Sequence, residues 1–314
     1  MFKKSLQSGG EEKKTFFSSL RDRSKRNDSM WEILVFLGPM FVIYTLFFTI
    51  PLFGGIYYSF TDWDGVRTAV NFIGLDNYRD LFFNDVHFIN SLRITFNFTV
   101  WNVLLTNIIA MLFAVALTSS FKFNNLFRAS IFLPNMIAMV VSGFIWLFMF
   151  NRVSQAFYAS TGIEFLNRSW LGNPDYVIGS IVLVSLWQGI GYIMTIYIAG
   201  LQGVDDSLIE AASIDGSNGW NTFWRIKMPI MLPTITVGAF INIAGSLRIF
   251  DTVMSLTAGG PGRASEMAMI NIYREAFVNN NMGYGAAKAT VLSVLIIVVA
   301  IMQFRFTSKK EVDF

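Results

Sequence analysis

Six long apolar stretches constrain the fold of this chain more than any other feature. They cover approximately residues 31–58, 88–117, 126–150, 176–200, 232–256 and 284–306. A helix needs roughly 20 apolar residues to cross a bilayer core, and each stretch reaches that length. Lipid cannot satisfy exposed backbone groups, and these runs are too continuous for the alternating strands of a barrel. The sequence therefore predicts an all-α integral membrane fold with six transmembrane helices.

Composition excludes several classes of protein. Only 14% of the 314 residues are charged and 54% are hydrophobic, whereas soluble domains carry about 25% charged residues. The absence of cysteine excludes disulfides and thiolate metal sites, and the single histidine, His87, excludes a two-histidine metal site. We expect no catalytic residue, no bound metal, no cofactor and no nucleic-acid partner.

One segment superficially resembles a phosphate-binding loop. Residues 283–290 contain Lys288 and Thr290, but Ala287 stands where such a loop needs glycine before the lysine. The segment also enters the last apolar stretch. We therefore interpret it as part of a span, and any ATP hydrolysis must come from another chain.

The basic residues predict the orientation of the spans. Cytoplasmic loops are enriched in Lys and Arg. The N-terminal tail carries eight of them: Lys3, Lys4, Lys13, Lys14, Arg21, Arg23, Lys25 and Arg26. The C-terminal end carries Arg305, Lys309 and Lys310, whereas aspartates dominate the first loop after residue 58. We expect both termini in the cytoplasm, with a basic tail over 1–30, a transmembrane domain over 31–306 and a second tail over 307–314.

The fourth loop, about residues 202–231, is long for a simple connection and should contain two short helices on the cytoplasmic side. Asp205, Asp206 or Ser207 can cap a helix over 207–215, and Gly216 can end it in a left-handed turn. One face of this helix is expected to be apolar and to comprise Leu208, Ala211, Ala212 and Ile214. The second helix should cover 220–227, ended by Pro229 and Pro233. Helices this short need a surface to rest on, so the loop is interpreted as a docking element.

The same loop resembles the EAA signature of importer permeases of the ATP-binding-cassette class. The resemblance rests on Glu210-Ala211-Ala212, on Asp215-Gly216, and on Phe223, Ile226, Pro229 and Pro233 at the family's spacing. Ser217 and Met228 depart from the usual Ala and Leu. The resemblance implies that Glu210, Ala211, Ala212, Asp215 and Gly216 dock on an ATPase subunit. It also implies a second related permease subunit and two ATP-binding cassette ATPase subunits as partners.

Further segments resemble the maltose-type carbohydrate permeases, in their six-span form and as the first of two paired subunits. The likeness covers roughly 31–306 and rests on Phe72-Ile-Gly-Leu-Asp-Asn-Tyr78, on Asp251 with Leu256-Thr-Ala-Gly-Gly-Pro261, and on Ile272-Tyr273, Ala276-Phe277 and Gly283-Tyr-Gly285. It implies a multi-pass subunit of a bacterial plasma membrane importer that moves a sugar, such as an oligosaccharide, delivered by an extracytoplasmic solute-binding protein.

Three alternatives stay open at this stage. The same machinery can carry a non-sugar solute such as glycerol phosphate or an oligopeptide. An ion-coupled secondary carrier would need an intramembrane carboxylate and often an internal repeat, and neither is evident in the sequence. A purely structural membrane anchor is disfavoured by the EAA resemblance.

Polar residues within the central two spans are candidate contacts for a substrate. Ser185, Gln188, Gly189 and Tyr192 share one face of the fourth span, and Asn242 and Ser246 share a face of the fifth with Ile249. Trp187 is a further candidate, and Arg248 and Asp251 are expected close enough to pair. In the family these spans line the path. Polar side chains also join packed helices, so both roles remain open for each residue. We interpret Asn97, Asn102 and Asn107 as helix–helix contacts.

Overall fold

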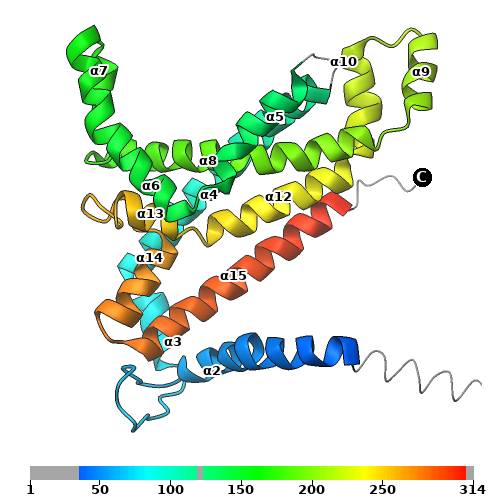
Figure 1. Ribbon diagram of the computed structural model, residues 1–314. Helices are drawn as coiled ribbons and strands as arrows, with labels where there is room; N and C mark the ends of the chain where they lie inside the picture. Colours follow the sequence, from blue (N-terminus) through cyan, green and yellow to red (C-terminus); the bar gives the residue numbers. More distant parts are fainter. Residues whose placement is uncertain (1–34, 119–122, 309–314) are drawn as a thin grey trace, which may run out of the picture. The chain divides into compact units, whose positions relative to one another are not determined.

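The computed structural model describes residues 35–118 and 123–308, and these fold almost entirely as helices (Figure 1). Within that part of the chain the strand-like pairing is a single antiparallel bridge between Thr61 and Phe72. The basic tail over 1–30 and residues 309–314 lie outside the described residues. The chain divides into two compact units, and the boundary between them falls between Tyr57 and Tyr58.

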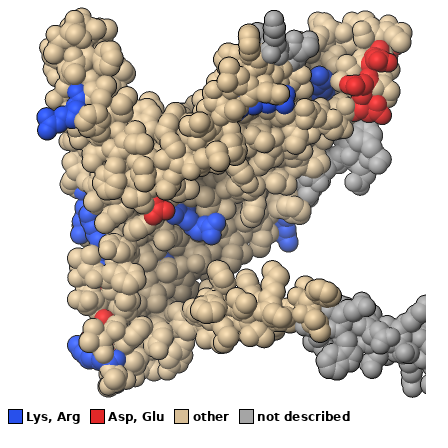
Figure 2. Space-filling model, in the orientation of Figure 1, with Lys and Arg blue, Asp and Glu red and all other residues tan. Residues whose placement is uncertain are grey.

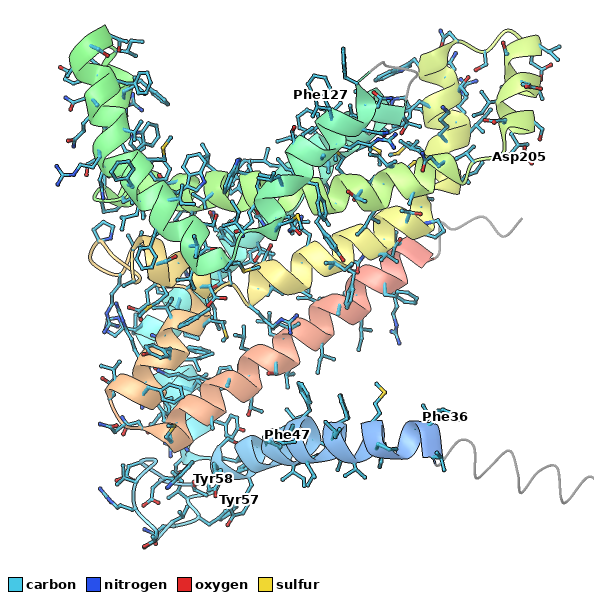
Figure 3. All side chains as sticks on the ribbon, viewed as in Figure 1. Phe36, Phe47, Tyr57, Tyr58, Phe127 and Asp205 are labelled. Atoms are coloured by element: carbon cyan, nitrogen blue, oxygen red, sulfur yellow. The ribbon has the colours of Figure 1, made fainter. Side chains whose placement is uncertain are left out.

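The described part of the first unit is one helix that begins at Val35 and is long and apolar enough to cross a membrane. It contains a π-helical turn over Thr45–Thr49 and continues as α2 (Ile50–Tyr58). Phe36 and Phe47 project outward from its axis (Figure 3). The predicted first span corresponds to a continuous helix from Val35 to Tyr58, and its first residues, 31–34, lie outside the described residues.

The second unit contains three further continuous helices of spanning length: α4 (Val86–Thr118), α8 (Pro174–Gln202) and α15 (Met282–Ser308). They agree with the second, fourth and sixth predicted stretches to within a few residues. The remaining α-helices are α3 (Asp76–Phe83), α5 (Asn124–Phe132), α6 (Met139–Phe148), α7 (Ser154–Thr161), α9 (Asp206–Ile214), α10 (Gly219–Thr222), α11 (Met228–Ile230), α12 (Leu232–Leu247), α13 (Asp251–Leu256) and α14 (Ala268–Tyr273).

The third predicted span is not one straight helix. The helical segments Asn124–Met136 and Met139–Thr161 meet at an angle of 98°. Pro134 has no N–H to continue the helix, the chain tightens into a 3₁₀ turn over Leu133–Met136, and Ile137 is extended. The predicted span over 126–150 thus corresponds to a bent pair of helical segments, and the hydrophobic pattern carries no information about this break.

The fifth predicted span also ends early. Helix α12 stops at Leu247, where Arg248 leaves the helical conformation, and α13 then begins at Asp251. The expectation of one helix over 232–256 was therefore wrong. At its other end, α12 meets the segment Gly219–Ile230 at 70°. That segment runs past Pro229, which directly follows a π-helical turn over Phe223–Lys227, so the predicted end of the second loop helix at Pro229 was wrong.

Helix α8 is the most deeply buried of these long helices, with half of the residues in its most apolar stretch buried. It packs along α4, and Phe98, Val177, Ile181 and Val184 are fully buried there. A β-carbon on Gly191 would lie 2.3 Å from the carbonyl oxygen of Ile131. Glycine at this position therefore lets the backbones of α5 and α8 touch, as small residues do between membrane helices.

Candidate functional site

The first short helix of the 202–231 loop forms where the sequence predicts it. Asp205 caps α9, accepting the N–H of Ser207 at 2.9 Å (Figure 3). That hydrogen bond from Ser207 holds the pKa of the Asp205 carboxyl below its ordinary value. Gly216 has a φ of +78°, a conformation that favours glycine, so it ends the helix in the left-handed turn predicted for it.

Helix α9 presents its acidic side to solvent. Glu210, Ala211, Asp215 and Gly216 are exposed, while Ala212 is buried. Figure 2 shows the acidic side chains gathered over this helix. Four of the five residues of the predicted docking set are thus accessible, and the fifth anchors the helix.

The apolar face expected for α9 was wrong in its composition. Ile214 is 87% exposed and Leu208 is 42% exposed. The inward side carries Ala212, which is buried, and Ile209, which is half-buried. Ile209 and the exposed Ser213 border a cavity of about 440 Å³ beneath the loop. All of these residues lie in one nine-residue helix. In so short a helix, the spacing of the apolar residues does not determine which side faces the rest of the protein.

The second helical segment of the loop adds two exposed aromatic rings. Trp220 is 70% exposed and Trp224 is 48% exposed, with ring centroids 5.7 Å apart. Leu208 and Ile214 of α9 are further exposed apolar side chains of this loop.

The six candidate path residues all border one cavity of about 450 Å³. Ser185, Gln188, Gly189 and Tyr192 reach it from α8, and Asn242 and Ser246 reach it from α12. Helical spacing had grouped these residues on two separate faces, and the structure brings the two faces together.

Three of these six residues, Gln188, Asn242 and Ser246, also hold helices together. The Gln188 side chain donates from Nε2 to the carbonyl oxygen of Ile137 at 2.8 Å, which satisfies a backbone group freed by the bend of the third span. The Asn102 Nδ2 donates to Ser246 Oγ at 2.9 Å and to Asn242 Oδ1 at 3.2 Å. Asn102 is therefore a helix–helix contact, as expected, but it makes that contact within the wall of the cavity.

Other expectations about this region fail or change. Trp187 packs edge-on against Trp146, with ring centroids 5.7 Å apart, and is not among the residues that line the cavity. No ion pair joins the two described side chains Arg248 and Asp251; Arg248 Nε donates instead to the carbonyl oxygen of Ala244 at 3.1 Å. Both charged residues border the cavity, where α12 gives way to α13.

A buried ionic cluster was missed entirely by the sequence reasoning. Lys288 is 1% exposed, and its Nζ lies 2.8 Å from Asp85 Oδ2 and 2.9 Å from Glu275 Oε2. Asn271 accepts from the same Nζ at 3.0 Å and donates to Glu266 at 2.7 Å. The signal in the sequence was a lysine within an apolar span, which is costly unless it is paired.

The carboxylates of this cluster are more acidic than usual. Burial raises the pKa of Asp85, but the hydrogen bonds from Lys288 and from the N–H of Phe88 outweigh it, so the net pKa lies below its ordinary value. Burial also raises the pKa of Glu275, and the hydrogen bonds from Asn281 and Lys288 bring it below the ordinary value.

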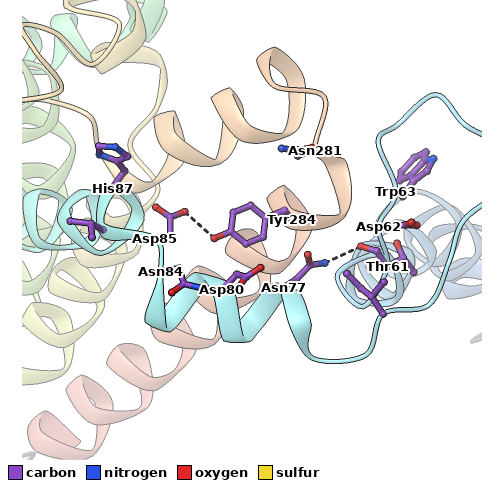
Figure 4. A pocket seen from close by; sticks show the side chains of 12 residues that line it. Thr61, Asp62, Trp63, Asn77, Asp80, Asn84, Asp85, His87, Asn281 and Tyr284 are labelled. Carbon is purple, nitrogen blue, oxygen red and sulfur yellow. Dashed lines mark hydrogen bonds between the residues drawn. The ribbon is translucent and has the colours of Figure 1, made fainter.

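Asp85 also borders a second cavity, of about 720 Å³, that is separate from the candidate path (Figure 4). Tyr284 donates to Asp85 Oδ2 at 3.0 Å there, and Asn77 donates to the carbonyl oxygens of Ser59 and Thr61 at 2.9 Å. His87 lines the same cavity and is exposed.

Several relatives are similar to this chain over nearly its whole length. The probable starch degradation products transport system permease protein AmyD of Thermoanaerobacterium thermosulfurigenes is 38% identical over 279 residues, which cover 89% of this chain and 94% of that protein. The multiple sugar-binding transport system permease protein MsmF of Streptococcus mutans is 31% identical, covering 88% and 95%. The sn-glycerol-3-phosphate transport system permease protein UgpA of Agrobacterium fabrum is 31% identical, covering 87% and 94%.

The fold has a counterpart among solved structures. A crystal structure of a bacterial ABC transporter involved in the import of the acidic polysaccharide alginate superposes with a TM-score of 0.79 at 19% identity, covering 91% of this chain and 98% of that chain. Residues 106–312 match the family described as binding-protein-dependent transport system inner membrane component. The helical architecture, the cavity between α4, α8 and α12, and these similarities agree, and the chain belongs to the family of binding-protein-dependent transport system inner membrane components.

Proposed function

We propose that this chain is a permease subunit of an ATP-driven importer of sugars and forms half of the translocation path. The observation that carries the proposal is the 450 Å³ cavity, where six polar or small residues from α8 and α12 converge inside an apolar bundle. Amide and hydroxyl groups suit the hydroxyls of a sugar, and Tyr192 offers an aromatic face. The names of the relatives AmyD and MsmF support the same substrate class.

The proposed topology is six spans with both termini in the cytoplasm, counting each bent helix pair as one span. The positions of Lys and Arg in the sequence support this orientation. The permease domain then covers 31–306, between cytoplasmic tails over 1–30 and 307–314. A second, related permease would complete the path, and an extracytoplasmic binding protein would deliver the sugar.

We propose further that α9 docks on a separate ATPase subunit, which hydrolyses the ATP. Its exposed residues Glu210, Ala211, Asp215 and Gly216 support this role, as does the apolar surface beside them. Closure of the ATPase dimer would move α9, and through it the attached spans, as a rigid displacement of one half of the transporter against the other.

Co-purification of the intact complex tests the docking role. We expect Glu210→Arg to lose the ATPase subunit, because it reverses an exposed charge on α9. Glu164→Arg reverses a charge outside the loop and should retain the subunit. Retention by both variants would contradict the docking role of α9. Gly216→Pro is a second test, since proline cannot adopt the positive φ of this turn.

Uptake by the reconstituted complex tests the substrate. A glycerol phosphate importer is the second candidate, because UgpA is similar over the same length of chain. Sugar-dependent stimulation of ATP hydrolysis supports the first candidate. Stimulation by glycerol 3-phosphate alone supports the second and contradicts sugar import.

A further inference from the structure

Helix α4 contributes a third wall to the cavity. Asn102 and Thr106 border it alongside the residues of α8 and α12. Both side chains are almost completely buried, with exposed fractions of 7% and 1%. Their place in the sequence, well before α8 begins at Pro174, gave no reason to group them with the candidate path.

Four buried polar atoms on this cavity have no hydrogen-bond partner within the protein. They are Asn102 Oδ1, Thr106 Oγ1, Ser185 Oγ and Asn242 Nδ2. A buried polar atom without a partner destabilises the folded protein, so such atoms are uncommon. Four of them on one cavity, from three different helices, indicate a partner that occupies the cavity itself.

Neighbouring residues show that these free hydroxyls are exceptional. In α4, Thr95, Thr99 and Thr118 each donate to the carbonyl oxygen four residues earlier, at 2.6–2.7 Å. Thr106 lies in the same helix and makes no such bond. In α8, Ser180 donates to the carbonyl oxygen of Tyr176 at 3.1 Å, whereas Ser185 has no partner. Within α4 and α8, the buried hydroxyls left without a partner, on Thr106 and Ser185, are thus the ones that border the cavity.

Asn102 also orients Asn242. Its Nδ2 donates to Asn242 Oδ1 at 3.2 Å, and Ser246 Oγ donates to the same oxygen at 3.3 Å. The Asn242 amide therefore keeps its Nδ2 donor free. The wall offers one free donor, one free acceptor in Asn102 Oδ1, and two hydroxyls that can do either, which matches the groups of a polyol.

The charges around the cavity indicate an uncharged ligand. Of the residues that line it, only Arg248 and Asp251 are charged, and they have opposite signs. Their charges compensate each other, so the lining carries no net positive charge to neutralise a buried anion, which is expensive to bury alone.

We propose that Asn102 and Thr106 are specificity-determining residues of the path, and that this wall accepts an uncharged, hydroxyl-rich unit rather than a phosphate ester or a uronate. The inference rests on the proposed transport function, whose substrate class it narrows. Thr106 would bond a ligand hydroxyl directly. Asn102 would accept from one and hold Asn242 in place to donate to another.

The test uses the complete importer in liposomes, with its partner permease, ATPase subunits and binding protein. Uptake is measured for maltotriose, raffinose, glycerol 3-phosphate and an alginate trisaccharide, together with ATP hydrolysis. Thr106→Val should lower the saccharide moved per ATP about fivefold, the change expected when one hydrogen bond of about 1 kcal/mol is lost. Asn102→Leu should lower it at least as much.

Three controls separate a ligand contact from a structural effect. Thr99→Val removes a hydroxyl of the same helix that is bonded to Thr95 and lies off the cavity, and it should not change the ratio. Thr106→Ser restores the hydroxyl and should restore transport. Ser185→Ala probes the opposite wall if Thr106→Val fails to assemble, and it should lower the ratio similarly.

Each remaining outcome overturns a defined part of the argument. If the neutral saccharides move but Thr106→Val and Ser185→Ala both behave like Thr99→Val, the polar wall is wrong and sugar import stands. If only the two anionic compounds move, the uncharged class is wrong. If none of the four compounds moves, the proposed import of sugars is itself contradicted, before any variant is compared.

Discussion

Lys288 Nζ lies 2.8 Å from Asp85 Oδ2, so the last long helix is tied to the start of α4 by a buried ion pair. Glu275 shares the same ammonium group at 2.9 Å. The lysine side chain is 1% exposed, and the two carboxylates are 12% and 16% exposed. A charge buried this deeply is stable only while its partners remain.

Removing the lysine should therefore destabilise the protein strongly. We expect Lys288→Met to lower the free energy of unfolding by about 3 kcal/mol, because it leaves two largely buried carboxylates without a counter-charge. Thermal unfolding of the purified complex in detergent measures the effect. Arg67→Met is the control: it removes the arginine of an exposed ion pair with Asp64 and should cost less than about 1 kcal/mol. Equal melting temperatures for the two variants would contradict the buried pair.

The two partners should show strong coupling. Adding Asp85→Asn to Lys288→Met removes one of the orphaned charges, so the double variant should be more stable than the sum of the two single changes predicts. For side chains in direct contact we expect a coupling energy of about 1–3 kcal/mol. A double-mutant cycle on melting temperatures measures it, and strict additivity would show that the pair carries no interaction energy.

Acid should weaken the same cluster. The pKa values of Asp85 and Glu275 lie below their ordinary values, so below about pH 4 the unfolded chain binds more protons than the folded one. Their contribution to stability is complete above the ordinary carboxylate pKa and is lost as the pH falls through the lowered values. Melting curves from pH 7 down to pH 3.5 measure this loss. The variant Asp85→Asn with Glu275→Gln should show a smaller decline over that range; an unchanged decline would assign it to other groups.

The contact between α5 and α8 should tolerate no side chain at Gly191. Gly191→Ala places a β-carbon 2.3 Å from the backbone oxygen of Ile131, which forces the two helices apart, and we expect a loss above about 1 kcal/mol. Gly179→Ala is a matched control in the same helix, since nothing lies within 4 Å of the added carbon. There we expect a gain of about 0.5–1 kcal/mol from the helix preference of alanine. Similar melting temperatures for both variants would contradict the close approach.

The apolar stretches predicted the long helices well because a bilayer sets both their length and their composition. The breaks were harder to predict. Pro134 was a visible signal for the bend in the third span, whereas the end of α12 at Leu247 falls inside an otherwise continuous apolar run that contains Arg248. A mean hydropathy taken over the whole run is changed little by one arginine, so it does not reveal that the helix ends there.

Helical spacing correctly grouped the cavity residues of α8 and of α12, since each group needs only one helix to be regular. It could not group them with Asn102, which contacts Ser246 across 144 residues of sequence, nor pair Lys288 with Asp85. Such contacts depend on the packing of whole helices. The lysine itself is recognisable in the sequence as a charge in an apolar span, and such a charge indicates a buried partner.

The ion cluster of Lys288 joins residues that are synthesised at very different times. Glu275 leaves the ribosome 13 residues before Lys288, whereas Asp85 leaves it about 200 residues earlier. The last span thus carries Lys288 near its start, and a compensating carboxylate precedes it in the helical segment Arg274–Val278. Asp85, at the start of α4, has by then already been synthesised, and it forms its ion pair with Lys288 when the last helix packs against that end of α4.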